Sequence, residues 1–196
     1  MSNNVDSVSA DSSFYICFVD DLEEKEWIYK FIKLYSFYIG RRVLSEIPET
    51  LFNDDDFKNS VNIVDYDYYS LIKPIFGRNP KHLEDGEYEA IGIAHYLDIL
   101  GELRYLILDD RRAKNFVKNN FEYLADKVVG TIGFIRNSCL EDGKLECEEG
   151  IEILNKIKEV IKSGKKRPLN LNEKKCKEII DPIIEELLSG GNNGRE

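Results

Sequence analysis

Continuously apolar runs alternate along the chain with segments in which apolar residues recur at helical spacing. The runs at 14–19 (FYICFV) and 105–108 (YLIL) are typical of strands that are buried on both faces of a parallel sheet. Shorter runs at 37–40, 61–66 and 127–131 predict three more strands.

Amphipathic segments separate these strands. The clearest is 87–100, where the apolar residues fall on one helical face, and 146–164 begins with acids and ends with lysines before Gly164. The helices predicted in this way cover 22–35, 41–47, 67–77, 87–100, 111–126, 132–143, 146–164 and 172–190. Alternating strands and helices predict an α/β fold, a three-layer α/β/α sandwich with a central, mostly parallel sheet and additional C-terminal helices.

The polar segments set the expected domain boundaries. We expect a disordered leader over 1–12, one domain over 13–145, a helical extension packed on it over 146–190, and a disordered tail over 191–196. The segment 49–60 is expected to be a loop.

Composition narrows the classes of function. The 196 residues carry a net charge of −10, which argues against a broad surface coated with nucleic acid but not against a local acidic site. The sequence has no apolar run of membrane-spanning length and no secretory signal, so we expect a cytoplasmic protein. The four cysteines lack zinc-site spacing and are expected to be reduced thiols, with Cys17 in the core.

The two long apolar runs both end in paired aspartates, Asp20-Asp21 and Asp109-Asp110. The carboxyl ends of parallel strands share one edge of a sheet, so both pairs are expected at the same crevice. Clustered carboxylates repel one another unless they are protonated or bind cations, and their oxygens favour Mg²⁺ or Mn²⁺. The alternative is that these aspartates only cap the helices that follow them.

Three motifs in the second half resemble one family of enzymes. They are GEYEAI at 86–91, LDDRRA at 108–113 and VGTIG at 129–133, within residues 85–145. In this order they resemble the PIN-domain nucleases, specifically the archaeal and bacterial branch with GExEAI, LxDDRRA and VxGTxG elements. The resemblance implies a PIN-like domain and an Mg²⁺- or Mn²⁺-dependent endoribonuclease, which in this family is often the toxin of a toxin–antitoxin pair.

The same resemblance implies roles for individual residues. The implied catalytic residues are Asp20, Glu46, Glu89 and Asp110, and the implied metal ligands are Asp20, Glu89, Asp109 and Asp110. Two choices stay open, because Glu87 lies near Glu89 and because one of the adjacent Asp109 and Asp110 is expected to cap the next helix.

Basic residues beside the acids are candidates for RNA binding. Arg111 and Arg112 are expected either to contact phosphates or to pair with neighbouring carboxylates. The basic stretch 162–170 either contacts nucleic acid or complements a helix end. The expected partners are an RNA substrate, an antitoxin or another protein, and a second copy of the chain.

A second function competes with the nuclease. Asp20 is followed by Asp21 and Leu22, where the family usually has a small hydroxyl or amide residue. This departure favours a catalytically degenerate PIN-like module that binds RNA or protein. A receiver-like phosphate-transfer domain ranks below both, because Lys127 precedes its strand rather than following it.

Overall fold

A central parallel sheet organises the protein in the computed structural model, which describes residues 6–70, 72, 85–166 and 168–190. The five strands follow the order β3-β2-β1-β4-β5, and every neighbouring pair is parallel. Their bounds are β1 Ser7–Ala10, β2 Ser36–Gly40, β3 Asn62–Val64, β4 Leu103–Ile107 and β5 Val128–Val129. The α/β/α sandwich predicted from the sequence is confirmed.

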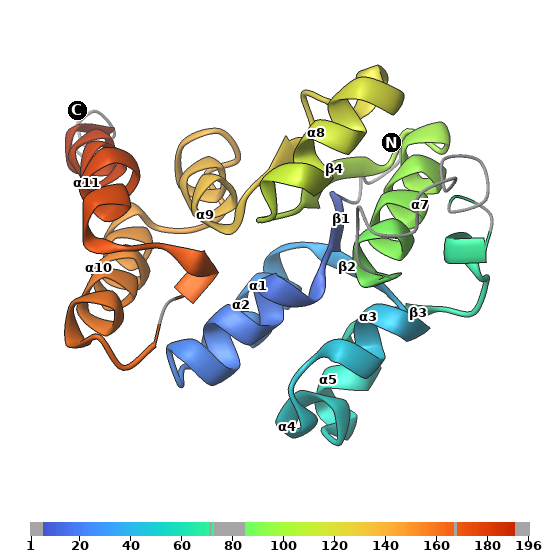
Figure 1. Ribbon diagram of the computed structural model, residues 1–196, viewed down its shortest axis with the longest axis horizontal. Coiled ribbons are helices and arrows are strands. Elements are labelled where there is room, and N and C mark those ends of the chain that lie inside the picture. Colours follow the sequence, from blue (N-terminus) through green and yellow to red (C-terminus); the bar gives the residue numbers. More distant parts are fainter. Residues whose placement is uncertain (1–5, 71, 73–84, 167, 191–196) are drawn as a thin grey trace.

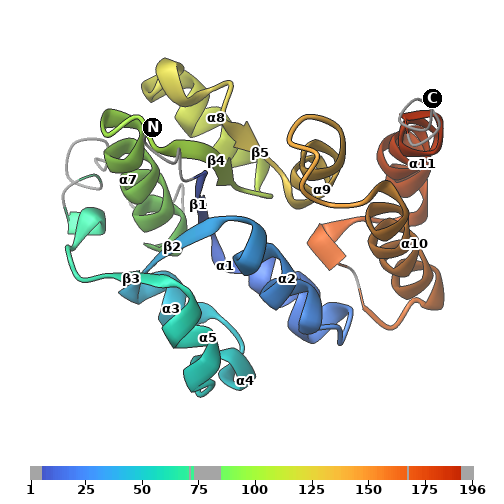
Figure 2. The same ribbon diagram turned by 180° about the vertical axis from the view of Figure 1, so that it is seen from behind.

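Helices cover both faces of the sheet (Figures 1 and 2). The N-terminal half contributes α1 Ser12–Ile16, the π-helical turn η1 Cys17–Asp21, α2 Glu26–Leu34, α3 Arg41–Glu46, α4 Glu49–Phe52 and α5 Asp55–Ser60. The second half contributes α7 Asp85–Ile99, α8 Arg111–Asn120, the short η2 Glu122–Leu124 and α9 Thr131–Leu140. Helix α7 packs across β1, β2 and β4, whereas α2 and α9 pack on the strands from the other side.

The expected strand at 14–19 is wrong, because this apolar run forms α1 and η1. The run is apolar on all sides since the helix is enclosed: Phe14, Tyr15 and Phe18 are fully buried, and the ring of Phe14 contacts those of Phe18 and Phe37. A largely buried helix without polar residues on its outer face lacks the pattern by which helices are recognised, so its sequence matches that of a buried strand.

The true first strand lies in the segment expected to be a disordered leader. Residues Ser7–Ala10 form β1, the central strand of the sheet, and all four are buried. Ser9 is accommodated there because its hydroxyl donates a 2.9 Å hydrogen bond to the carbonyl of Ala90 in α7. The domain therefore begins before residue 13, and residues 1–5 lie outside the described residues.

The other elements follow the sequence more closely. Strands β2 to β5 and helices α2, α3 and α7 to α9 lie where their apolar patterns predict them, with shifts at the ends. The loop expected at 49–60 is instead two short helices, and Asp54 caps the second by accepting from the amides of Asp56 and Phe57. Of the predicted helix 67–77, residues 68–70 and 72 are helical and the rest lie outside the described residues.

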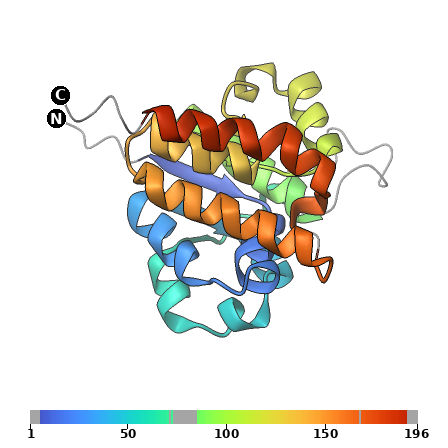
Figure 3. The same cartoon turned by 90° about the vertical axis from the view of Figure 1, so that its left-hand side faces the viewer.

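The helices that follow α9 pack against it. Helix α10 Cys147–Ser163, the short η3 Pro168–Asn170 and α11 Glu173–Gly190 form a helical layer in which α10 and α11 lie side by side and both pack against α9 (Figure 3). The expected tail, 191–196, lies outside the described residues. None of the described helices is both long and apolar enough to cross a bilayer.

Candidate functional site

The crevice at the carboxyl ends of β1 and β4 lies where the chain changes direction across the sheet. From β1 the chain proceeds to β2 and β3 on one side, and it later returns to place β4 on the other side. Ligands of open α/β sheets bind at such a switch point. Asp11 directly follows β1, and Asp109 stands two residues after the end of β4, so both aspartates lie at this crevice.

Asp11 is a buried carboxyl group with one oxygen unused. Its Oδ1 accepts a 3.1 Å hydrogen bond from the amide of Ser13 and caps α1, whereas Oδ2 is buried and has no hydrogen-bond partner among the described residues. Burial raises the pKa of Asp11 to about 8, with further contributions from the nearby charges of Asp109 and Glu87. An orphaned, buried carboxylate oxygen beside other acids is a strong candidate for cation binding.

Asp109 is held by Thr131, at the N-terminus of α9. The Thr131 amide donates to Oδ1 at 2.9 Å and the Thr131 hydroxyl donates to Oδ2 at 2.6 Å. Burial still raises the pKa of Asp109, although these hydrogen bonds oppose the shift. Gly130 is needed for this approach, since a Cβ there would lie 2.7 Å from Lys114 Nζ and 2.9 Å from Asp109 Oδ1.

Glu46, at the end of α3, reaches the same edge from the side. Its carboxylate accepts from the Ser12 hydroxyl at 3.0 Å and from the Gly86 amide at 3.1 Å. A Cβ at Gly86 would lie 2.3 Å from Glu46 Oε2, so only glycine permits this contact. The structure thus brings Glu46 next to Ser12, the residue that follows Asp11.

Glu87 and Glu89, between which the sequence leaves the choice of ligand open, differ in their surroundings. Glu89 Oε2 accepts from the amides of Arg42 and Val43, both at 2.9 Å, and so caps α3, whose own N-cap is the side-chain-free Gly40. Burial nevertheless raises the pKa of Glu89. Glu87 is also buried and is the acid whose charge acts on Asp11. Glu87 is therefore the better candidate ligand, and Glu89 serves the structure.

Asp109 and Asp110 divide their tasks in the manner expected for adjacent residues. Asp110 Oδ1 accepts from the amides of Arg112 at 2.6 Å and Ala113 at 3.1 Å, so it is the N-cap of α8. Arg112 also pairs with Asp110 at 3.4 Å, which is the structural alternative foreseen for this arginine. Asp110 is thus engaged as a cap, while Asp109 lies deeper beside Asp11.

Asp20 does not lie at the end of a strand. The prediction that placed it at the crevice for that reason is therefore wrong. It belongs to η1, and its backbone carbonyl accepts a hydrogen bond from Lys166. The neighbouring Asp21 does reach the site and lines its pocket, and burial raises the pKa of Asp21. The position expected for Asp20 is occupied by Asp11.

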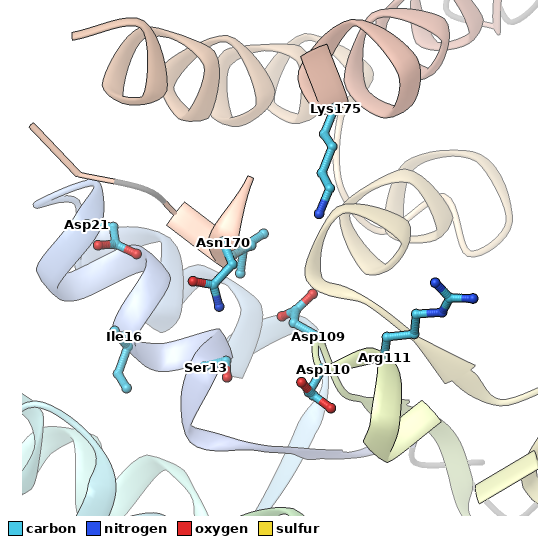
Figure 4. Close-up of a pocket in the computed structure, with 9 residues that line it drawn as sticks. Ser13, Ile16, Asp21, Asp109, Asp110, Arg111, Asn170 and Lys175 are labelled. Atoms are coloured by element: carbon cyan, nitrogen blue, oxygen red, sulfur yellow. The ribbon is translucent and has the colours of Figure 1, made fainter. Parts of the chain in front are cut away.

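A pocket of about 460 Å³ opens beside Asp109 (Figure 4). The sheet domain lines it with carboxylates and with the cation of Arg111, and the C-terminal extension adds an amide and an ammonium group. The lining residues are Ser13, Ile16, Asp21, Asp109, Asp110, Arg111, Leu169, Asn170 and Lys175. In Figure 4, Lys175 points from α11 toward Asp109 and Asn170 lies between Asp21 and Asp109.

Sequence reasoning missed Asp11, Thr131 and Lys175. The sequence does carry a signal for Asp11, because the following Ser12 and Ser13 are small hydroxyl residues of the type that the resemblance associates with the first aspartate. Thr131 lies within the VGTIG motif, but its contact with Asp109 depends on the pairing of β4 with β5. Nothing in the local sequence of Lys175 indicates that α11 returns to the crevice.

Within the described ranges, no three His, Cys, Asp or Glu side chains are grouped so that they could hold a metal ion. The chain matches no protein-family model, no curated protein and no solved structure.

Proposed function

We propose that the protein is a metal-dependent endoribonuclease whose hydrolytic site is the crevice between the ends of β1 and β4. The observation that carries this proposal is the buried Asp11 Oδ2 atom, which has no hydrogen-bond partner among the described residues although the charge of Asp109 acts on the same carboxyl. The resemblance of residues 85–145 to PIN-domain nucleases supports the same assignment.

The candidate donors are carboxylates, the type of ligand that Mg²⁺ or Mn²⁺ prefers, although no three acids of the described residues are grouped as a metal site. Asp11, Asp109 and Glu87 offer carboxylate oxygens at the crevice, with Glu46 at its side. Hard divalent cations prefer such oxygens, and a bound cation would offset the burial and the like charges that raise the pKa of Asp11. When bound, a divalent cation supplies activation of water and stabilisation of negative charge on phosphate oxygens.

The chain's own residues position these groups. Thr131 fixes both oxygens of Asp109, and the Ser13 amide fixes one oxygen of Asp11, so that Oδ2 of Asp11 is the oxygen left for a ligand. Held carboxylates of this kind lose little entropy when a ligand binds. Arg111, at the wall of the pocket, is suited to hold a phosphate group of the substrate.

The degenerate, non-catalytic alternative loses its main support. It depended on the residues that follow Asp20, whereas the aspartate at the strand end is Asp11, which is followed by Ser12 and Ser13. An antitoxin or other protein partner, a homodimer, and a cytoplasmic location stay predictions from the sequence.

The test is cleavage of a labelled single-stranded RNA by the purified protein. We expect activity with Mn²⁺ or Mg²⁺, loss of activity in excess EDTA and its return when Mn²⁺ is restored. Asp11→Asn should reduce the rate by about a thousandfold or more, because it removes a ligand charge from the site.

Two variants with the same chemical change serve as controls. Asp55→Asn, on the exposed side of α5, should cleave like the wild type. Asp20→Asn distinguishes two assignments. The assignment from the sequence expects this variant to be inactive, whereas the assignment from the structure expects it to cleave RNA. Cleavage that persists in excess chelator, or that is unaffected by Asp11→Asn, would refute the proposal.

A further inference from the structure

The C-terminal extension contributes cationic and amide groups to a pocket whose floor is acidic. Asn170 of η3 and Lys175 in the first turn of α11 line the same cavity as Asp109, although more than sixty residues separate them from it in the sequence. Figure 4 shows the Lys175 side chain extended from α11 toward this floor. The pocket therefore has negative groups on the domain side and a positive group facing them.

The cations of this pocket are not used to neutralise neighbouring acids. Neither Lys175 nor Arg111 forms an ion pair with any of the residues that the structure describes, although Asp109, Asp110 and Asp21 share the pocket with them. By contrast, Lys166 pairs with Glu23 at 2.7 Å and Arg112 pairs with Asp110. Lys175 faces the cavity and Arg111 lies at its edge, and cations without a protein partner beside a cavity are suited to an anionic ligand.

Hydrogen bonds hold the segment that carries Lys175 in place. Lys166 donates to the backbone carbonyl of Asp20 and to Glu23, which fixes the chain leading into η3 against η1. The Lys175 amide donates to Asn172 Oδ1 at 2.9 Å and so begins α11 at a defined position. These contacts fix the position of the Lys175 backbone beside the pocket.

The backbone of η3 has an unusual conformation at the pocket. Leu169 and Asn170 both have positive φ, at 55° and 54°, a conformation that is unfavourable for leucine and tolerated by asparagine. The turn directs the exposed Asn170 side chain into the cavity between Asp21 and Asp109. Unfavourable backbone conformations of this kind are concentrated at ligand-binding sites.

We infer that Lys175 and Asn170 form a phosphate-binding wall of the active site and that, together with Arg111, they hold the backbone of a single-stranded polynucleotide. This inference rests on the proposed function, because the polynucleotide is the substrate whose phosphodiester reaches Asp11 and Asp109. A cavity of about 460 Å³ has the size of a small-ligand site, so it admits a nucleotide of a flexible strand. A rigid duplex would need a longer surface of phosphate contacts than one pocket provides.

The experiment measures binding separately from cleavage. A fluorescent single-stranded RNA of about a dozen nucleotides, within the size range of single-strand sites, is titrated with the Asp11→Asn protein in Mg²⁺ buffer, and anisotropy is followed at several salt concentrations. Lys175→Ala in this background should weaken binding by about five- to tenfold. It should also lower the slope of log K against log salt by about 0.7, the loss of one phosphate contact.

Matched variants control for the effect of changing the net charge of the protein. Lys174→Ala should change affinity by less than about twofold, because Lys174 lies outside the pocket and its ammonium group pairs with Glu178. Asn170→Asp places a negative charge in the pocket and should weaken binding as much as Lys175→Ala. Asn172→Asp adds the same charge two residues away, retains the helix cap and should have little effect.

Competition with unlabelled strands tests the class of ligand. Single-stranded RNA should compete more strongly than a duplex of the same sequence, and single-stranded DNA shows how far the 2′-hydroxyl contributes. The inference is overturned if Lys175→Ala and Lys174→Ala bind alike, if the duplex competes better than the single strand, or if no strand binds. Equal melting temperatures of the four variants verify that each is folded.

The outcomes separate this inference from the proposed function. If the wild-type protein cleaves RNA in an Asp11-dependent way but Lys175→Ala matches its control in both binding and KM, only the phosphate-binding wall is refuted. If no cleavage is found but binding depends on Lys175, the hydrolytic proposal is refuted and the wall is supported.

Discussion

Asp11 and Asp109 lie at the same crevice but differ in what holds them. Both lie at the carboxyl ends of neighbouring parallel strands, and both are buried deeply enough for their pKa values to be raised. Asp109 has both oxygens hydrogen-bonded by Thr131, whereas Asp11 has one oxygen held by Ser13 and the other without a partner among the described residues. The sheet places the two carboxyl groups, and the adjoining helices determine how much of each is available to a ligand.

Asp109 and Asp11 differ in their hydrogen bonds because different elements lie beside β4 and β1. Strand β4 pairs with β5, and the chain leaves β5 into α9, so Thr131 is delivered to Asp109. The charges that act on Asp11 come from Asp109 and Glu87, which are acids themselves. We therefore expect the two aspartates to respond differently to pH, to cations and to substitution.

The largest expected effect concerns the stability of the metal-free protein. The raised pKa of Asp11 means that the native state retains a proton that the unfolded state releases, so stability falls as pH rises from about 4 to about 8. The fall is about 1.4 kcal/mol per pH unit over this window, and below it the carboxyl is protonated in both states. Asp11→Asn removes this cost, so the variant should exceed the wild type by several kcal/mol at pH 8 and by little at pH 4.

Urea unfolding at a series of pH values measures this directly. Asp109→Asn should gain less, because the amide cannot accept both Thr131 hydrogen bonds. Mn²⁺ should stabilise the wild type at pH 8 and not Asp11→Asn. A stability profile of Asp11→Asn that runs parallel to that of the wild type would contradict the assignment of a buried, protonated Asp11.

A smaller effect is expected when the support of Asp109 is removed. Thr131→Val deletes the hydroxyl that donates to Oδ2 but keeps the backbone amide and the shape of the side chain. Loss of a group that orients a metal ligand typically lowers activity by about 10- to 100-fold. The rate of RNA cleavage should fall by that amount, and Thr131→Ser should restore it. Equal rates in Thr131→Val and the wild type would show that Asp109 needs no such support.

The smallest effect separates the two glutamates of α7. Glu89→Gln weakens the cap of α3 and should cost about 0.5–1 kcal/mol of stability, while cleavage continues. Glu87→Gln removes a negative charge that acts on Asp11, so it should lower the pKa of Asp11 and reduce cleavage. Glu89→Gln should therefore lower the temperature of thermal unfolding more than Glu87→Gln, whereas Glu87→Gln should lower the cleavage rate more. If Glu89→Gln were the inactive one, the assignment of Glu87 to the site would be wrong.

The fold was predictable from the sequence because most of its elements have one-sided apolar patterns. Helices α2 and α10 are examples, and β4 contains a continuous apolar run from Tyr105 to Ile107; the alternation of helices with such strands predicts a parallel sheet. The first strand was not predicted, for the opposite reason. Strand β1 is only Ser7–Ala10 and contains two serines. It is recognisable only from its pairing with β2 and β4. The enclosed helix next to it then carried the stronger strand signal.

The candidate site was predictable in part for a related reason. Asp109, Asp110 and Glu46 were found because their motifs are local, and Asp110 fills the capping role that adjacency required of one of the two aspartates. Asp11 was missed together with its strand, and Glu89 was preferred to Glu87 because sequence spacing does not show which carboxylate turns back to cap α3. Lys175 depends on the packing of α11 against α9, which has no local signature.

The order of the residues around the pocket has a consequence for the chain during its synthesis. Asp11 is translated first, Asp109 and Thr131 much later, and Asn170 and Lys175 later still. A nascent chain that has left the ribosome only as far as α9 holds the acids but not the cationic wall facing them. On the proposed function, full affinity for a polynucleotide would be acquired only when α11 has been released and has packed, and the growing protein would not act on RNA before then.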